Sequence, residues 1–482
     1  MIDTKKMFLF IFILTAPIEL LAQGGSSEYK DGMTLKFDSA GKKYIRILTW
    51  GNFWARYTNA NPGTSIGGFE KKNWTDFSLR QFRLLTYSQL SPRYLILADI
   101  GIDNQSFSSG GSAGGGNSGN GGDNFSGTLG KKPMIYLHEL WNEYTILPDK
   151  DYKTGSQKNF SLYIGTGLHY WMGISRMSTA SSANYLAVDV PIYNWPLVDA
   201  SDQFGRQLGI YLKGNLDRMS YRWAVNKPFS VRNPSADFPN GSSEYQYAVD
   251  NNADGNLSTT GYFSWQFLEK ENNMLPYTTG TYVGTKKVFN IGAGYYFQHN
   301  GTTTQQSGIA GAPLINHNIR LFSADIFADI PFGPKSKNWA VTSYTAYYNY
   351  NFGPKYLRNG SIINENVSRA ANYTGEVSQA GFGNLAPLIG TGNIFFSQAG
   401  ILLPKRTQAP GEMRVQVFGE FSLQKFERFN NAPLTYYSAG CNLFLDGHHA
   451  KVSFKYQTRP IIITDRQNGS KGSYIISTQV YL

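Results

Sequence analysis

Arginine and lysine side chains recur at alternate positions of short segments whose other positions are apolar or aromatic. In residues 44–57 the even positions include Arg46 and Arg56, whereas the odd positions include Phe53 and Tyr57. Guanidinium and ammonium groups bind the oxygens of phosphate, sulfate and carboxylate, and several of them around a narrow, wet space concentrate anions there. Nine cationic side chains are therefore candidates for a pore-lining, anion-binding set: Arg46, Arg56, Arg80, Arg83, Arg176, Arg222, Arg414, Lys451 and Lys455.

The alternative is that these cations pair with inward acidic side chains and have only a structural role in the barrel wall. The acids available for such pairing are Asp99, Glu139, Glu143, Asp325, Asp329 and Glu420. Surplus charge, not paired charge, sets the field of a pore, and the whole chain has a formal net charge of +11. In an exported protein this surplus favours anionic solutes or anionic lipid headgroups over nucleic acid.

One short segment has the pattern of a cation site. Asp250, Asn252 and Asp254 stand at alternate positions before Gly255, like the first half of a calcium-binding loop. The acidic twelfth position is missing, because Gly261 stands there. We therefore expect either an external loop that holds one Ca²⁺ or a plain Asn/Asp/Gly turn, and no other cofactor.

Catalytic patterns are weak. A barrel enzyme such as an outer-membrane phospholipase needs a serine and a histidine side by side, and His169, His299 and His317 have no serine at a recognisable spacing. We therefore expect no enzymatic activity.

The amino terminus has the pattern of a secretory signal peptide. Residues 1–22 contain Lys5 and Lys6, then an apolar run that is too short to span a bilayer, and a small residue at Ala22. We expect a mature chain that starts near Gln23, a periplasmic segment over 23–43 and one barrel domain over 44–482.

The composition of the remaining chain favours an all-β protein. Aromatic residues make up 15% of the chain, glycines number 51, and a single cysteine excludes an intramolecular disulfide. The sequence predicts about sixteen strands, over 44–58, 75–90, 93–103, 133–146, 159–169, 204–214, 218–227, 258–269, 287–300, 318–330, 339–351, 392–403, 412–424, 434–445, 448–458 and 473–482.

The predicted strands are joined by connections that alternate between long and short. Short ones include Ser91–Pro92, Asn215–Asp217 and Asp446–Gly447, and the long ones include 104–132, 170–203, 228–257 and 351–391. Tight turns at one end and long loops at the other are typical of a transmembrane β-barrel, with the short turns in the periplasm. The glycine-rich part of 104–132 reads as a flexible external loop.

The last predicted strand tells how the barrel is closed. Tyr474, Ile476 and Val480 alternate with polar residues, and the chain stops at Leu482. An unpaired strand edge is costly in hydrocarbon, so we expect this strand to pair with the first one. The fold class is thus an all-β, antiparallel up-and-down transmembrane barrel of about sixteen strands, with apolar side chains toward lipid and charges toward a wet lumen.

Three stretches resemble the phosphate-selective porin O/P family in the form found in Bacteroidota. They are the late hairpin Gly440–Gln457, the arginine-bearing early hairpin Phe77–Gly101 and the middle hairpin Asp202–Phe229, and their order agrees with the family. The resemblance implies a porin in the outer membrane of a Gram-negative bacterium, in contact with lipid and lipopolysaccharide. It also implies a homotrimer.

Two functions remain open at this point. The first is a porin for passive diffusion of small anionic or neutral solutes, with a preference for anions such as phosphate. The second is a plugged barrel that serves a surface or secretion complex. The segment 170–203, which carries Arg176, either folds into the lumen as a constriction or forms an ordinary surface loop.

Overall fold

The computed structural model describes residues 33–39, 41–106, 135–151, 154, 156, 158–197, 205–230, 247–273, 275–305, 313–334, 337–406 and 412–482. Within these ranges, no helix is long and apolar enough to cross a membrane. The predicted signal peptide, and most of the glycine-rich connection, lie outside the described residues.

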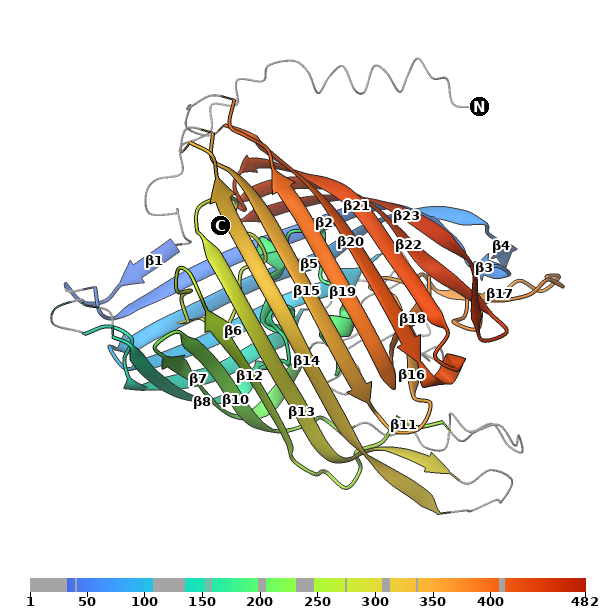
Figure 1. The fold of residues 1–482 in the computed structure, drawn as a ribbon, viewed down its shortest axis with the longest axis horizontal. Helices are drawn as coiled ribbons and strands as arrows, with labels where there is room; N and C mark the ends of the chain where they lie inside the picture. The colour runs from blue at the N-terminus through green and yellow to red at the C-terminus, as the bar shows by residue number, and fades with distance from the viewer. Residues whose placement is uncertain are drawn as a thin grey trace.

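Sixteen antiparallel strands form a closed barrel (Figure 1). They are β2 (Tyr44–Asn59), β5 (Asn73–Ser91), β6 (Tyr94–Gln105), β7 (Tyr136–Leu147), β8 (Phe160–Tyr170), β9 (Arg206–Leu216), β10 (Met219–Lys227), β12 (Ser258–Gln266), β13 (Val288–Gln305), β14 (Leu314–Phe332), β15 (Trp339–Asn351), β19 (Gly392–Leu402), β20 (Arg414–Phe426), β21 (Pro433–Asp446), β22 (Ala450–Ile463) and β23 (Arg466–Tyr481). The predicted fold class is confirmed.

The first and last barrel strands pair with each other, as expected. The register runs from Trp50 opposite Tyr481 to Thr58 opposite Ser473. Because β2 also pairs with β5 on its other side, the sheet has no free edge there.

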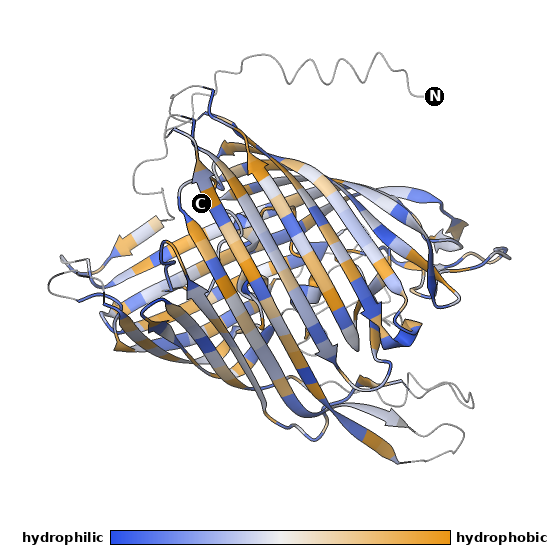
Figure 2. Cartoon of the chain, in the orientation of Figure 1, coloured by the Kyte–Doolittle hydropathy of each residue, from blue (hydrophilic) through white to orange (hydrophobic). Residues whose placement is uncertain are grey.

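Side chains alternate between the two faces of the wall in the predicted sense. In β2, Phe53 and Tyr57 are exposed on the outside, whereas Trp54 and Arg56 are buried on the inside. Figure 2 shows hydrophobic and hydrophilic residues alternating along the strands. The outer face is therefore apolar and the inner face carries charge.

The inner face also carries aromatic residues. In β15, whose sequence does not show which face is apolar, Tyr344, Tyr348 and Tyr350 are buried inside the barrel. They belong to one hydrophobic cluster with parts of the connection between β8 and β9.

The two ends of the barrel differ in their connections. At the short-turn end, Asp217 joins β9 to β10 with a φ of 53° and Gly447 follows β21 with a φ of 52°. At the long-loop end, β22 and β23 extend further than predicted, so that only Thr464 and Asp465 join them. The predicted strand 448–458 is therefore too short.

Short elements cover both ends. At the short-turn end, β1 (Met33–Lys36) pairs with the start of β2. At the other end lie a sheet of β3 (Thr64–Ile66), β4 (Phe69–Glu70) and β17 (Val367–Arg369), the pair β16 (Leu357–Gly360) and β18 (Ala386–Gly390), and β11 (Val249–Asp250), which pairs with β13 (Figure 1).

Residues 171–197, between β8 and β9, fold into the barrel, and we call them the insert. They contain three short 3-10 turns, η3 (Arg176–Thr179), η4 (Ser182–Asn184) and η5 (Ile192–Asn194). The ribbon of these turns lies inside the ring of strands (Figure 1), and most of their residues are buried. Of the two alternatives for the segment 170–203, the structure selects the one inside the lumen for the described residues 171–197.

Candidate functional site

The insert is held by hydrogen bonds from opposite parts of the wall. Thr260 of β12 donates to the Gly173 carbonyl at 2.8 Å, and Tyr350 of β15 donates to the Tyr193 carbonyl at 2.6 Å. Gln479 of β23 donates to the Ala183 carbonyl at 2.8 Å. Because its anchors lie on both sides of the barrel, the insert crosses the lumen.

One wall position must be a glycine for the insert to approach. A Cβ added to Gly294 of β13 would overlap the carbonyl group of Ile174. The absence of a side chain there lets the backbone of the insert lie directly against the sheet.

The connection between β12 and β13, residues 267–287, lies at the short-turn end of the barrel and contacts the insert there. Arg176 of the insert forms a two-pronged ion pair with Glu271, both contacts measuring 2.6 Å. The Arg176 guanidinium also lies 3.7 Å from the centre of the Phe327 ring. Burial alone would raise the pKa of the Glu271 carboxyl, but the charge and hydrogen bonds of Arg176 bring that pKa below its ordinary value.

This ion pair predicts how docking of the insert depends on pH. A carboxyl whose folded pKa is lowered stabilises the folded arrangement above its ordinary pKa of 4.5, and loses that contribution as pH falls through the lowered value. We expect amide hydrogen exchange in η3 to be constant between pH 7 and pH 5, after correction for intrinsic rates, and to accelerate only below pH 4.5. In the Glu271→Gln variant, amide exchange in η3 should be faster than in the wild type at every pH. It should also show no further acceleration below pH 4.5, which we call the acid step. An acid step that survives in this variant would assign it to another group.

Two arginines of β5 share the inner face although they are three positions apart. A β-bulge between Asn52 and Phe53 of β2 skips one residue of β5, so that Arg80 and Arg83 both point inward. Arg80 pairs with Asp189 of the insert at 2.6 Å. Regular alternation would have placed one of the two arginines outside.

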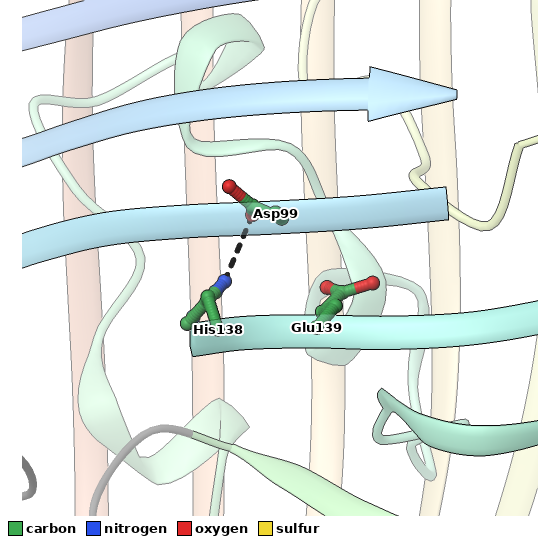
Figure 3. A group of neighbouring side chains, drawn as sticks. All are labelled: Asp99, His138 and Glu139. Carbon is green, nitrogen blue, oxygen red and sulfur yellow. Dashed lines mark hydrogen bonds and ion pairs between the residues drawn. The ribbon is translucent and has the colours of Figure 1, made fainter. Parts of the chain in front are cut away.

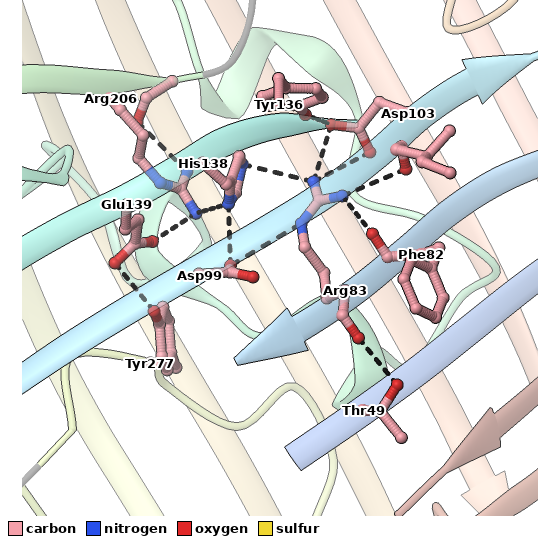
Figure 4. Close-up of polar contacts among 12 residues, drawn as sticks. Thr49, Phe82, Arg83, Asp99, Asp103, Tyr136, His138, Glu139, Arg206 and Tyr277 are labelled. Carbon is pink, nitrogen blue, oxygen red and sulfur yellow. Dashed lines mark hydrogen bonds and ion pairs between the residues drawn. The ribbon is translucent and has the colours of Figure 1, made fainter. Parts of the chain in front are cut away.

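Arg83 begins a network that runs across β6, β7 and β9 (Figure 4). It contacts Asp103 at 2.7 Å and Asp99 at 3.8 Å. At the other end of the network, Arg206 pairs with Glu139 at 2.7 Å. Arg206 was not among the predicted residues.

Asp99, His138 and Glu139 bring three potential metal ligands within 4.8 Å of one another (Figure 3). His138 Nδ1 lies 3.0 Å from Asp99, but the ring nitrogens of His138 also lie 3.3 Å from Arg83 and from Arg206. A metal ion would have to enter between two guanidinium groups that already neutralise the carboxylates. The cluster is therefore better described as an ion-pair network than as a metal centre.

Five of the predicted cations have acidic partners within 4.0 Å in the described part of the chain. Besides Arg80, Arg83 and Arg176, these are Arg56, which contacts Asp76 at 2.8 Å, and Lys455, which contacts Glu420 at 2.6 Å. Lys213 and Glu143 form a further pair at 3.0 Å.

Two of the acids expected to pair with cations do something else. Asp325 accepts a hydrogen bond from the Arg176 backbone N–H at 2.7 Å, and Asp329 accepts one from the Tyr282 backbone N–H at 2.7 Å. Both carboxylates thus fix the two connections that fill the lumen.

The other four predicted cations have no acid within 4.0 Å among the residues that the structure describes. Arg222 donates to Thr179 Oγ1 at 2.7 Å, Lys451 Nζ lies 3.4 Å from the Tyr185 carbonyl oxygen, and Arg46 donates to Tyr87 at 2.8 Å. Arg414 donates to a backbone carbonyl at 2.6 Å. The interior therefore combines paired charges with isolated cations.

The residues of the predicted calcium loop have separate partners. Asp250 accepts from Arg358 at 2.8 Å, whereas Asp254 accepts from Asn300 at 3.0 Å. Asn252 donates to the Phe229 carbonyl at 2.7 Å. These contacts favour a structural turn, and the calcium site stays a prediction.

Two cavities lie on either side of the insert. The first is lined by Trp54, Arg56, Tyr193, Phe396, Lys455 and Arg459, and we call it the Arg459 cavity. The second is lined by Arg80, Arg83, Asp99, His138, Arg206 and Tyr277. Val190, Ile192, Ser361 and Ile362 line both cavities and form the wall between them.

Comparisons with known proteins find similarity in structure only. No protein-family model and no curated protein sequence matches the chain. Solved structures that resemble it include the outer membrane channel DcaP of Acinetobacter baumannii, with 8% identity, a TM-score of 0.46 and coverage of 93% of this chain and 99% of the other. OprB of Pseudomonas putida has 9% identity and a TM-score of 0.48, with coverage of 90% of this chain and 94% of the other. An anion-selective porin from Comamonas acidovorans has 9% identity and a TM-score of 0.42, with coverage of 91% of this chain and 100% of the other. These TM-scores are all below 0.5, so the similarity assigns no function to this chain.

Proposed function

We propose that the protein is an outer-membrane porin through which small hydrophilic solutes diffuse passively. The observation that supports this most directly is a closed barrel with an apolar outer face and a charged inner face, crossed by an insert that leaves a cavity on each side. A barrel of this strand number is wide enough to enclose an aqueous channel, and the insert narrows it.

The outer face supports a membrane location. Phe421 of β20, Phe454 of β22, and Ile476 and Val480 of β23 are large apolar side chains on the outside of the barrel, and each is between 41% and 56% exposed. Such a contiguous apolar surface is unfavourable in water and favourable against lipid tails. We place the short-turn end in the periplasm, residues 1–22 in a signal peptide and residues 23–43 in a periplasmic segment.

The orientation of the wall predicts the effect of a charge on its outer face. Phe454→Lys should lower the free energy of unfolding by roughly 2–4 kcal/mol, because an ammonium group would enter the hydrocarbon layer. Denaturant unfolding in lipid vesicles measures the change. Phe69→Lys is the matched control, since Phe69 is 72% exposed in β4 beyond the barrel wall, and it should change stability by less than about 0.5 kcal/mol. Equal effects of the two substitutions would contradict the membrane location.

We further propose a modest preference for anions, including phosphate, and membership of the phosphate-selective porin O/P family. Arg222, Lys451 and Arg414 support the preference, because they face the interior without an acidic partner in the described ranges. The ion pairs of the other cations argue for a modest preference, since paired charges contribute little net field. Lipopolysaccharide contact and a homotrimer are part of the same proposal.

A plugged barrel in a surface or secretion complex is the second candidate. It is favoured by the burial of inward cations, for example Lys213, which is fully buried, and Arg222, which is 5% exposed. Purified protein in a planar lipid bilayer separates the two functions. Stepwise conductance supports the porin, and a folded barrel that inserts without conducting supports the plugged barrel.

A further inference from the structure

The Arg459 cavity joins an apolar lining to a cluster of charged groups. Tyr193 of the insert, Phe396 of β19 and Ile475 of β23 supply apolar surface, and Ile362 of the connection between β15 and β19 closes one side. A ring-sized apolar body fits such a lining, which a strongly hydrated ion does not need.

The charges around this cavity do not cancel. Arg56 is paired with Asp76, Lys455 with Glu420, and Asp189 with Arg80. Arg459 is the lining cation that has no acid within 4.0 Å in the described residues. The cavity therefore has a surplus of one positive charge.

Arg459 is held in place with one nitrogen free. Its Nε donates to Asn61 Oδ1 at 3.1 Å, and its Nη2 donates to the carbonyls of Asn59 and Gly383, the latter at 3.2 Å. Its Nη1 donates to none of the residues that the structure describes. The guanidinium is thus oriented by three fixed acceptors and keeps a donor for a ligand, although Arg459 is only 7% exposed.

Two further donors at the cavity are buried without a partner. Trp54 Nε1 and Arg56 Nε form no hydrogen bond with the described residues, and both side chains are at most 5% exposed. A buried donor without a hydrogen-bond partner is unfavourable, so a ligand that brings acceptor oxygens next to Trp54 and Arg56 would be favoured. A carboxylate supplies two acceptor oxygens.

From this geometry we propose that the Arg459 cavity is a binding site for small monocarboxylates with an apolar, ring-sized body. The inference rests on the proposed porin function, since the channel would bring the solute to the site. One negative charge matches the surplus of Arg459, and the body of the ligand lies against Tyr193, Phe396 and Ile475. The site would slow such solutes relative to ions that cross without contact.

Isothermal titration calorimetry with the detergent-purified full chain tests the site directly, using benzoate as the probe. Benzyl alcohol keeps the ring without the charge, whereas acetate and inorganic phosphate keep a charge without the ring. We expect benzoate to bind at least about tenfold more tightly than each of them, because charge-assisted hydrogen bonds and apolar burial both contribute. No benzoate binding, or equal binding of benzoate and any one of these probes, would overturn the proposal.

Two variants locate the binding in the cavity. Arg459→Gln should weaken benzoate binding about tenfold or more. Ser473→Leu, which fills the cavity from β23 without changing a charge, should abolish it. Arg218→Gln is the matched control and should leave benzoate binding unchanged, since Arg218 also donates to backbone carbonyls but lies outside this cavity.

Unchanged binding in Arg459→Gln and Ser473→Leu would overturn the site, provided that both variants keep the heat-modifiable electrophoretic mobility of a folded barrel. Calorimetry does not require conduction. A barrel that binds benzoate but passes no current would therefore overturn the porin function and support the binding site. A barrel that conducts but does not bind benzoate would support the porin function and overturn the binding site.

Discussion

Replacing residues 173–203 with a short glycine–serine turn should raise the single-channel conductance by about threefold or more, since a barrel of this size without an insert encloses an open aqueous channel. The wall should tolerate the change, because β8 and β9 are hydrogen-bonded neighbours as far as the pair Tyr170 and Arg206. A short turn can therefore close this hairpin. Planar-bilayer recording in symmetric salt measures the conductance.

The matched control removes one anchor and leaves the insert in the chain. Tyr350→Phe deletes only the hydrogen bond to the Tyr193 carbonyl, so its mean conductance should stay near that of the wild type, with more frequent brief openings. If the shortened barrel is folded and its conductance equals that of the wild type, the insert does not set the width of the pathway.

The barrel could be predicted from the sequence because its signals are local and repeated. Alternation fixes the facing of several strands, as in β22, where Lys451 and Lys455 point inward and Phe454 points outward. The alternation of long and short connections fixes the up-and-down topology. These signals were sufficient to place all sixteen barrel strands.

The interior could be predicted only in part, because its contacts join residues far apart in the sequence. The β-bulge that turns both Arg80 and Arg83 inward has no signature in the sequence beyond the odd spacing of the two arginines. Likewise, Asp189 pairs with Arg80 from the middle of the insert. A sequence pattern shows which side chains face the lumen, but not which of them meet.

Arg459 was missed for a different reason. It follows the predicted strand 448–458, whereas β22 continues to Ile463 and keeps the inward position for this residue. A proline at 460 argues against a strand interior, although here it lies near the long-loop end. The signal that could have identified Arg459 is its parity with Lys451 and Lys455.

Lys451→Glu should shift the ion preference of the channel toward cations, by about two- to tenfold in the ratio of anion to cation permeability. Lys451 is 4% exposed on the inner wall and has no acid within 4.0 Å in the described chain, so its charge is not cancelled locally. Two unit charges about 8 Å apart interact by about 2 kcal/mol at an effective dielectric constant of 20, and tenfold corresponds to about 1.4 kcal/mol. The reversal potential in a salt gradient gives the ratio.

The size of the shift separates a field effect from a change in the pore itself. Lys451→Arg keeps the charge and should leave the reversal potential unchanged, and Lys36→Gln removes a charge from exposed β1 outside the barrel wall and should do the same. The shift in Lys451→Glu should shrink as salt rises from 0.1 M to 1 M, because the screening length falls from about 10 Å to about 3 Å. A shift that is independent of salt would instead mean that the substitution has moved the insert at Tyr185, whose carbonyl Lys451 contacts, and that the isolated cations do not set the preference for anions.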